Sequence, residues 1–390
     1  MKICAVIAEY NPFHLGHLKH IDYIKSTLGA DKIIVIMSGN FTQRGEIAVL
    51  DKFTRAKHAV IAGADVVIEL PTVFALSNAE TFAKGAIKLI KSLGVVNTVC
   101  FGVESGTTEQ YVQLAKVLNQ ETKEFKVALK EHLDTGVSLA KAKFLAVQSV
   151  YGDKFNCELL NSPNNILALE YTKAILENNM DVEIEPMIRT GDHNDKTLKK
   201  DITSATSIRE TLKTGKIKKL KKNLPSFVYP DLKDYPFLFE KIIIAKLLST
   251  STEQLKTIAD CTEGLENRIK ALSYDNKNLD LLVQKISTKR YPATRIQRIL
   301  TNNLLEITSA LVLECLKNPL YLKVLAVNSQ SLDLISSISS TASVPTLTRK
   351  SDTLLLKKTA KLCFEKDVLA NELYSLITDD KLNENLMLVI

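Results

Sequence analysis

Two histidines flank a glycine near the N-terminus, in the stretch His14-Leu15-Gly16-His17. The stretch follows an apolar run at 3–8, typical of a β-strand, and leads into a helical pattern at about 17–28. The free N–H groups that begin a helix attract anions, and a glycine lets a phosphate approach the backbone. His14 and His17 can donate to phosphate oxygens and stabilise a leaving pyrophosphate, which predicts nucleotidyl transfer. Histidines that only cap a helix would give the same short motif.

Composition limits the class of protein. The chain has 390 residues, enough for two domains or three small ones, and its 45% apolar content is typical of a folded protein. Six scattered cysteines show no Cys-x-x-Cys spacing, which predicts reduced, buried thiols and no zinc site. The apolar N-terminus is too short for a signal peptide, and no uncharged stretch has membrane-spanning length. We therefore expect a soluble, cytoplasmic protein.

Positive charge is concentrated in two segments. The chain carries 51 Lys and Arg against 44 Asp and Glu, a net charge of +7. Six lysines lie within residues 213–222. They could bind an anionic partner, or they could simply form a solvated helix face. The second segment combines Tyr291 with four cations at a predicted helix start, namely Lys289, Arg290, Arg295 and Arg298. Cations beside an aromatic ring favour RNA phosphates and unstacked bases, so we expect an RNA-binding surface there.

Strand and helix patterns alternate in the first half. Strand-like runs at about 3–8, 33–37, 65–69 and 97–101 alternate with helical patterns at about 17–28, 50–62, 77–93 and 107–118. This alternation predicts βαβ units and a parallel sheet. Helical segments at about 122–149 and 163–177 precede a last predicted strand at 182–188. Beyond Pro225 the patterns are helical, with breaks at Pro292, Asn302-Asn303, Pro319 and Pro345 and a Ser-rich loop at 329–345. We expect an α/β parallel-sheet domain at 1–215 followed by an all-helical domain at 216–390.

Other segments of the first half have the composition of site loops. Residues 37–46 follow the second strand and offer Gly39, Gln43 and Arg44 at the carboxyl edge of the sheet. Residues 68–71 and 101–104 end the third and fourth strands. Ser204-Ala205-Thr206-Ser207-Ile208-Arg209 is typical of a second phosphate cradle, with Ser204, Thr206 and Arg209 as candidate ligands, although a Ser/Thr helix cap is the commoner meaning.

Five motifs occur in an order and spacing that resemble the bacterial tRNA(Met) cytidine acetate ligase family. They are residues 9–17, 37–46, 68–71, 163–167 and 204–209, and residues 288–300 resemble the family's basic helical segment. The resemblance implies a Rossmann-like nucleotidyltransferase domain followed by a helical region that helps hold tRNA. It also implies that acetate is activated with ATP to acetyl-adenylate, and that the acetyl group passes to N4 of the wobble cytidine of elongator tRNA(Met).

The resemblance also implies which residues act. His14 and His17 would be catalytic, and Mg²⁺ would be carried on the nucleotide phosphates rather than by a metal site of the protein. The residues implied in ATP binding are Ile7, Ala8, Glu9, Tyr10, Asn11, Pro12, Phe13, His14, Leu15, Gly16, His17, Leu18, Lys19, His20, Gly102, Asn164 and Arg189. The sequence departs from the family's pattern at two places. Ala168 stands where a glycine is expected. Residues 191–195 match a Tyr-His-Asp stretch only loosely, which leaves the role of His193 open.

Two alternatives remain at this point. A nucleotidyltransferase that joins AMP to a small phosphorylated metabolite would use the same histidine chemistry, although it needs little beyond the first domain. A non-catalytic RNA-binding protein could keep a nucleotide site for structural or regulatory reasons. The long helical half with its basic segment favours a macromolecular substrate.

Overall fold

The computed structural model describes residues 1–189 and 204–390. Its strands are β1 (Ile3–Ala8), β2 (Lys32–Ser38), β3 (Val66–Leu70), β4 (Thr98–Val103), β5 (Glu183–Ile188), β6 (Leu322–Val327), β7 (Thr346–Leu347) and β8 (Leu388–Val389). The helices up to β5 are α1 (Leu15–Ser26), α2 (Lys52–Ile61), α3 (Thr72–Ala75), α4 (Ala79–Leu93), α5 (Thr108–Gln120), α6 (Lys123–Asp134), α7 (Leu139–Tyr151) and α8 (Pro163–Glu177). Those after residue 203 are α9 (Ala205–Lys213), α10 (Leu238–Ser249), α11 (Thr252–Thr257), α12 (Leu265–Ser273), α13 (Leu279–Ile286), α14 (Ala293–Leu305), α15 (Ser309–Lys317), α16 (Leu332–Thr341) and α17 (Lys358–Thr378).

The sheet has the strand order β5-β4-β1-β2-β3-β6-β7, and β8 pairs with β6. Strands β1 to β5 are mutually parallel, whereas β6 runs antiparallel to β3. The chain winds outward from β1 to β3 and then crosses back to place β4 on the other side of β1. The carboxyl ends of β1 and β4 therefore form a topological switch point, where open parallel sheets bind ligands.

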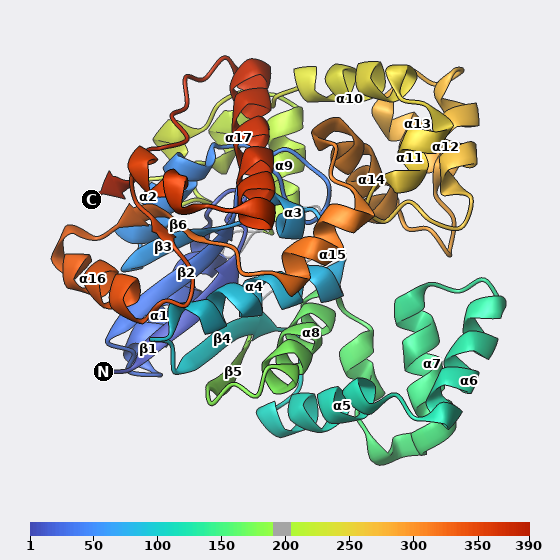
Figure 1. Cartoon of the computed structure of the whole chain (residues 1–390), viewed down its shortest axis with the longest axis horizontal. Coiled ribbons are helices and arrows are strands. Elements are labelled where there is room, and N and C mark those ends of the chain that lie inside the picture. The colour runs from blue at the N-terminus through green and yellow to red at the C-terminus, as the bar shows by residue number, and fades with distance from the viewer. Residues whose placement is uncertain (190–203) are drawn as a thin grey trace.

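Alternate residues along each central strand face two separate cores, because successive side chains point to opposite faces of a sheet. Ile34 and Ile36 of β2 face the larger core, which α4, α5, α8 and most of the later helices cover. Ile33 and Val35 face the smaller core, which α1, α2 and α9 cover. Figure 1 shows α10 to α14 grouped beside the sheet, with α6 and α7 projecting away from it.

The α/β class with a mainly parallel sheet is confirmed, and so are the five predicted strands of the first half. The expectation of an all-helical second half is wrong at β6, β7 and β8, which extend the sheet beyond β3. Strand β6 is buried along its whole length, so its sequence lacks the alternation that marks a half-buried strand. The division at residue 215 stays a prediction, and residues 191–195 with His193 lie outside the described residues.

Two local expectations for the second half are also wrong. Residues 329–345 contain helix α16 rather than a loop only. The expected break at Asn302-Asn303 lies inside α14. Both asparagines are buried with tertiary partners, since Asn302 Nδ2 donates to the Leu76 carbonyl at 3.1 Å and Asn303 Nδ2 donates to Thr250 Oγ1 at 3.1 Å. These bonds satisfy the Nδ2 groups of two residues that usually disfavour a helix interior, while Asn302 Oδ1 is buried without a partner among the described residues.

The six cysteines are free; five of them are buried, as predicted, and Cys157 is partly exposed. Across residues 1–189 and 204–390, we find no helix that is long and apolar enough to cross a membrane.

Candidate active site

A cavity of about 220 Å³ lies at the switch point of the sheet. Its walls include Ile7 and Ala8 from the end of β1, Gly102 from the end of β4 and Met187 from β5. The start of α1, the start of α8 and the start of α9 complete the enclosure. Of the segments described above as site loops, 37–46, 101–104 and 204–209 each contribute residues to the cavity, whereas residues 68–71 do not line it.

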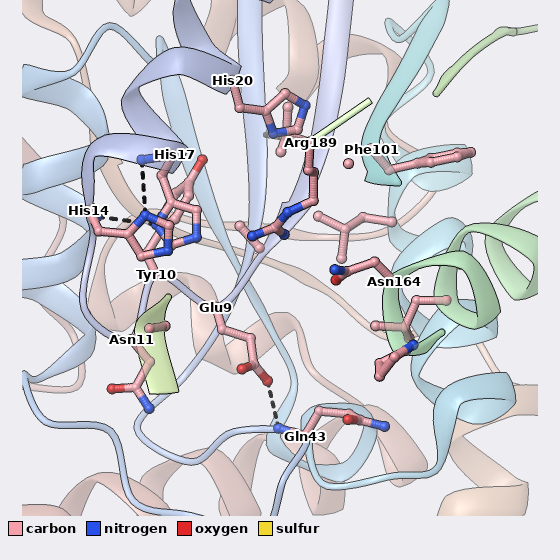
Figure 2. Close-up of a pocket in the computed structure, with 18 of the residues that line it drawn as sticks. Glu9, Tyr10, Asn11, His14, His17, His20, Gln43, Phe101, Asn164 and Arg189 are labelled. Carbon is pink, nitrogen blue, oxygen red and sulfur yellow. Dashed lines mark hydrogen bonds between the residues drawn. The ribbon is translucent and has the colours of Figure 1, made fainter. Parts of the chain in front are cut away.

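His14 and His17 lie side by side at one wall of the cavity (Figure 2). Their rings are stacked, with centroids 3.6 Å apart and an angle of 19° between the planes. The Gly16 N–H donates to His14 Nδ1 at 3.0 Å, and the His14 N–H donates to His17 Nδ1 at 3.2 Å. A ring nitrogen that accepts a hydrogen bond carries no proton, so in this arrangement each neutral imidazole has its proton on Nε2. Each ring can therefore donate a hydrogen bond from Nε2.

The two histidines also cap α1, as the structural alternative anticipated. They form a reciprocal capping box in which each side chain accepts from the backbone of the helix start. The expectation that the backbone N–H groups at this helix start can bind a phosphate is therefore wrong for Gly16. Its N–H is bonded to His14 and is not a free donor. Donors at this helix start come from side chains, and the cap fixes their orientation.

Arg189 extends into the cavity (Figure 2). Its side chain lies against Gly102. A Cβ atom on Gly102 would lie 2.9 Å from both Cγ and Cδ of Arg189, which explains why a residue without a side chain stands there. Burial lowers the pKa of Arg189, while the carboxylate of Glu104 opposes that change. Within the described parts of the chain, its guanidinium makes no ion pair or hydrogen bond. A partly buried, unpaired cation facing a cavity is suited to an anionic ligand.

Asn164 is held in the cavity wall by Glu104, at the end of β4. Its Nδ2 group donates to Glu104 Oε1, while Glu104 Oε2 accepts from Ser162 Oγ at 2.7 Å and from the Asn165 N–H at 3.2 Å. This carboxylate ties the start of α8 to the sheet. The amide oxygen of Asn164 is the group left to accept from a ribose hydroxyl or a base.

An aromatic wall faces these polar groups. Phe82, Phe101 and Tyr171 line the cavity, and the rings of Phe101 and Tyr171 lie 5.6 Å apart. Flat apolar side chains of this kind are suited to stacking on a nucleobase. Phe82 and Tyr171 were missed from the sequence, because they lie inside helices whose apolar residues read as ordinary core.

The loop after β1 is braced by bonds to residues 43–55. The Gln43 N–H donates to Glu9 Oε1 at 2.7 Å, and the Val49 N–H donates to Asn11 Oδ1 at 2.9 Å. The Nδ2 group of Asn11 and the hydroxyl of Tyr10 are buried and lack partners within the described residues, although both side chains belong to the cavity wall. Buried polar groups without partners are costly, so these two atoms add a local energetic cost behind the cavity wall.

His20 lies three residues after His17 on helix α1 and also lines the cavity. Its Nε2 atom is 3.2 Å from Cys100 Sγ. Burial, with a further contribution from the positive charge of Arg189, lowers the pKa of His20 to about 4. His20 is therefore neutral near pH 7 and acts as a polar wall group rather than a cation.

The predicted second phosphate cradle is present only in part. Thr206 and Arg209 line the cavity, whereas Ser204 caps α9 by accepting from the Ser207 N–H at 3.1 Å. Arg209 forms an ion pair of 3.2 Å with Glu46 and donates to the Asn11 carbonyl at 3.0 Å. Its charge is thus compensated, and its contacts hold two site loops together. Thr206 remains the residue of this motif best placed to contact a ligand.

Thirteen of the residues predicted to bind ATP line the cavity: Ile7, Ala8, Glu9, Tyr10, Asn11, His14, Gly16, His17, Lys19, His20, Gly102, Asn164 and Arg189. Pro12, Phe13, Leu15 and Leu18 do not. Phe13 is fully buried and packs against Tyr10, with ring centroids 4.7 Å apart. Phe13 therefore packs behind the cavity wall and does not face the cavity.

The predicted tRNA-binding cluster is largely neutralised by acidic neighbours. Arg298 is only 7% exposed and forms a 2.9 Å ion pair with Asp260, so its assignment to an RNA surface is wrong. Arg295 donates to the Asp260 carbonyl at 3.1 Å, and Arg290 pairs with Glu263 at 2.6 Å. Lys289 is exposed. The sequence could not reveal these pairings, because the acidic partners lie about 30 residues away on another loop.

Comparison with known proteins assigns the chain to a family. The model of the HIGH Nucleotidyl Transferase family matches residues 1–387. A tRNA(Met) cytidine acetate ligase from Thermoanaerobacter sp. (strain X514) is 37% identical over 385 residues, which cover 96% of this chain and 95% of the relative. The chain belongs to the tRNA(Met) cytidine acetate ligase family.

Solved structures agree with this assignment to the tRNA(Met) cytidine acetate ligase family. The crystal structure of Thermotoga maritima TmcAL in apo form I superposes with a TM-score of 0.92 at 27% identity, covering all of both chains. The structure of the same protein bound with alpha-thio ATP superposes with a TM-score of 0.89 over the same extent. The fold, including the strands contributed by the second half, is therefore shared along the whole chain.

Proposed function

We propose that this protein activates acetate with ATP as acetyl-adenylate and transfers the acetyl group to N4 of the wobble cytidine of elongator tRNA(Met). The observation that carries the proposal is the pair of stacked histidines whose Nδ1 atoms both accept backbone hydrogen bonds, which leaves Nε2 of each ring to donate. The same cavity contains Arg189, which has no ion-pair partner among residues 1–189 and 204–390. The name of the relatives and the α-thio ATP bound to Thermotoga maritima TmcAL support the choice of substrates.

The cavity offers a place for each part of ATP. The aromatic wall of Phe101 and Tyr171 suits the adenine base, and the Asn164 amide suits the ribose. His14 and His17 would donate from Nε2 to the β and γ phosphates. These donors matter most as charge grows on the leaving pyrophosphate, since hydrogen bonds aimed at developing charge stabilise a transition state selectively.

In the first half-reaction, a carboxylate oxygen of acetate attacks the α-phosphorus of ATP. A new oxygen–phosphorus bond forms, the bond from the α-phosphorus to the bridging oxygen breaks, and pyrophosphate leaves with the electron pair. Arg189 is positioned to hold either the acetate carboxylate or the α-phosphate, because its guanidinium has two parallel donors.

In the second half-reaction, cytidine N4 attacks the acetyl carbonyl of the adenylate. The carbon–nitrogen bond forms, the bond from the acetyl carbon to the phosphate oxygen breaks, AMP leaves and N4 loses one proton. A mixed anhydride hydrolyses readily, so the proposal requires that the bound substrates exclude bulk water from the cavity during transfer.

Mg²⁺ carried on the nucleotide phosphates would neutralise part of their charge. Glu9 lines the cavity, and its carboxylate is the type of donor that Mg²⁺ takes alongside phosphate oxygens.

Half-reaction assays test the proposal. With ATP and acetate but no RNA, the protein should release pyrophosphate slowly and retain acetyl-adenylate, which can be identified by mass spectrometry after quenching. Omitting acetate should abolish that release. Pyrophosphate release that ignores acetate but responds to a small phosphorylated metabolite would instead favour the metabolite-directed nucleotidyltransferase.

A further inference from the structure

A second basic segment differs in character from the 289–298 cluster. We call residues 216–222 the lysine segment; its five cations are Lys216, Lys218, Lys219, Lys221 and Lys222. The surrounding stretch 211–230 contains no Asp or Glu. Local sequence therefore offers these lysines no acidic neighbour.

The fold turns all five lysines outward. The 3₁₀ turn Ile217–Leu220 places Leu220, which is fully buried, in the smaller core, and Ile217 packs against the same core. Because the apolar residues anchor the inner side, the five lysine side chains are exposed. In the described parts of the chain, none of the five forms an ion pair. Their charge is left to solvent, unlike that of Arg290 and Arg298.

The lysine segment is tied to the active-site cavity at both of its ends. On its N-terminal side it follows α9, whose residues Thr206 and Arg209 line the cavity. On its C-terminal side, the ring of Phe227 lies 6.1 Å from that of Phe13, which in turn lies 5.5 Å from the ring of His17. Helix α9 has nine residues, or about 13 Å of helix axis, so the segment begins a short distance from the cavity.

We propose that the lysine segment binds the phosphate backbone of the RNA substrate beside the active-site cavity, an inference that rests on the proposed function. A dense, uncompensated run of lysines matches the regular negative charge of a nucleic acid. The segment exposes no large apolar side chain, since Ile217 and Leu220 face the core, and so it lacks the apolar contacts of a membrane-binding surface. Closeness to the cavity lets bound RNA reach the activated acetyl group.

The test compares three variants of the full-length protein. The first is Lys218→Ala/Lys219→Ala/Lys222→Ala in the lysine segment. The matched control is Lys116→Ala/Lys123→Ala/Lys126→Ala, which removes the same charge from exposed lysines of α5 and α6, on the other face of the sheet. The third variant, Lys289→Ala/Arg290→Ala, tests the most exposed part of the 289–298 cluster. Affinity for a tRNA(Met) transcript is measured by fluorescence anisotropy at several salt concentrations.

The lysine-segment variant should bind the transcript roughly tenfold or more weakly, and its slope of log affinity against log salt should be shallower by about 2 to 3. Its acetate-dependent pyrophosphate release and melting temperature should match those of the unaltered protein. The control should bind like the unaltered protein. Wild-type affinity and slope for the lysine-segment variant, or an equal loss in the control, would overturn the inference.

Failure of this inference can be separated from failure of the proposed function. If the unaltered protein acetylates tRNA while the lysine-segment variant binds normally, the surface assignment fails and the proposed function stands. If the unaltered protein binds tRNA through this segment but shows no acetate-dependent pyrophosphate release, the surface assignment stands and the proposed activity fails. Loss of binding to phosphatidylserine vesicles with unchanged RNA affinity would assign the segment to membranes and overturn the inference.

Discussion

Substituting Gly102 by alanine tests the placement of Arg189 without touching its charge. The new Cβ would lie 2.9 Å from Cγ and Cδ of Arg189, closer than real Cβ contacts, so the arginine side chain must leave its position in the cavity. A hydrogen bond to a charged group contributes about 1.5–3 kcal/mol, and its loss should weaken ATP binding about 10- to 150-fold. Gly102 has no positive φ angle, so alanine imposes no backbone strain of that kind.

Titration calorimetry with ATP measures this effect in a double-mutant cycle of Gly102→Ala and Arg189→Ala. Each single variant should lose affinity. In the Arg189→Ala background, Gly102→Ala should have little further effect, since the atoms that it would meet are gone. Melting temperatures report whether the fold survives. Wild-type affinity for Gly102→Ala, or a full additional loss in the Arg189→Ala background, would refute the reasoning.

Three further predictions follow from the site. His14→Ala or His17→Ala should slow acetyl-adenylate formation roughly a hundredfold at saturating ATP, while loss of the cap costs only about 1 kcal/mol of stability; near-normal rates would exclude a catalytic role. Because burial lowers the pKa of His20 to about 4 from 6.5, the unfolded chain gains a proton first as pH falls. Stability should therefore decrease between pH 6.5 and 4, and His20→Gln should remove up to about 3 kcal/mol of that decrease in urea unfolding; equal pH dependences would contradict this. Arg298→Ala should lower the melting temperature by several degrees, because it removes the ion-pair partner of the largely buried Asp260 carboxylate and leaves it only the hydrogen bond from Asn78; an unchanged melting temperature would mean that the pair is not structural.

Local patterns were sufficient to predict the βαβ half of the fold. Strands β1 to β4 each combine an apolar run with a following helix of clear period, so their order and type could be read directly. Strand β6 could not be recognised in the same way. It is a short apolar run that pairs with β3 across more than 250 residues of chain, and such a run reads equally well as part of a buried helix.

The site could be predicted from the sequence where the residues of one motif position each other. His14 and His17 cap the helix that they begin, so their geometry follows from four consecutive residues. Arg298 illustrates the opposite case: a cation next to an aromatic residue suggests RNA binding, but its environment is set by Asp260 from another loop. Tyr171 likewise reads as a core residue of α8, and only the packing of that helix against β4 places its ring in the cavity wall.

The most direct test of the central proposal is incubation of the protein with ATP, isotopically labelled acetate and total bacterial tRNA, followed by nucleoside analysis. The account predicts label in N4-acetylcytidine at the wobble position of elongator tRNA(Met), dependent on ATP and absent from the His17→Ala variant. Label that never enters RNA, despite ATP consumption and an intact fold, would contradict it.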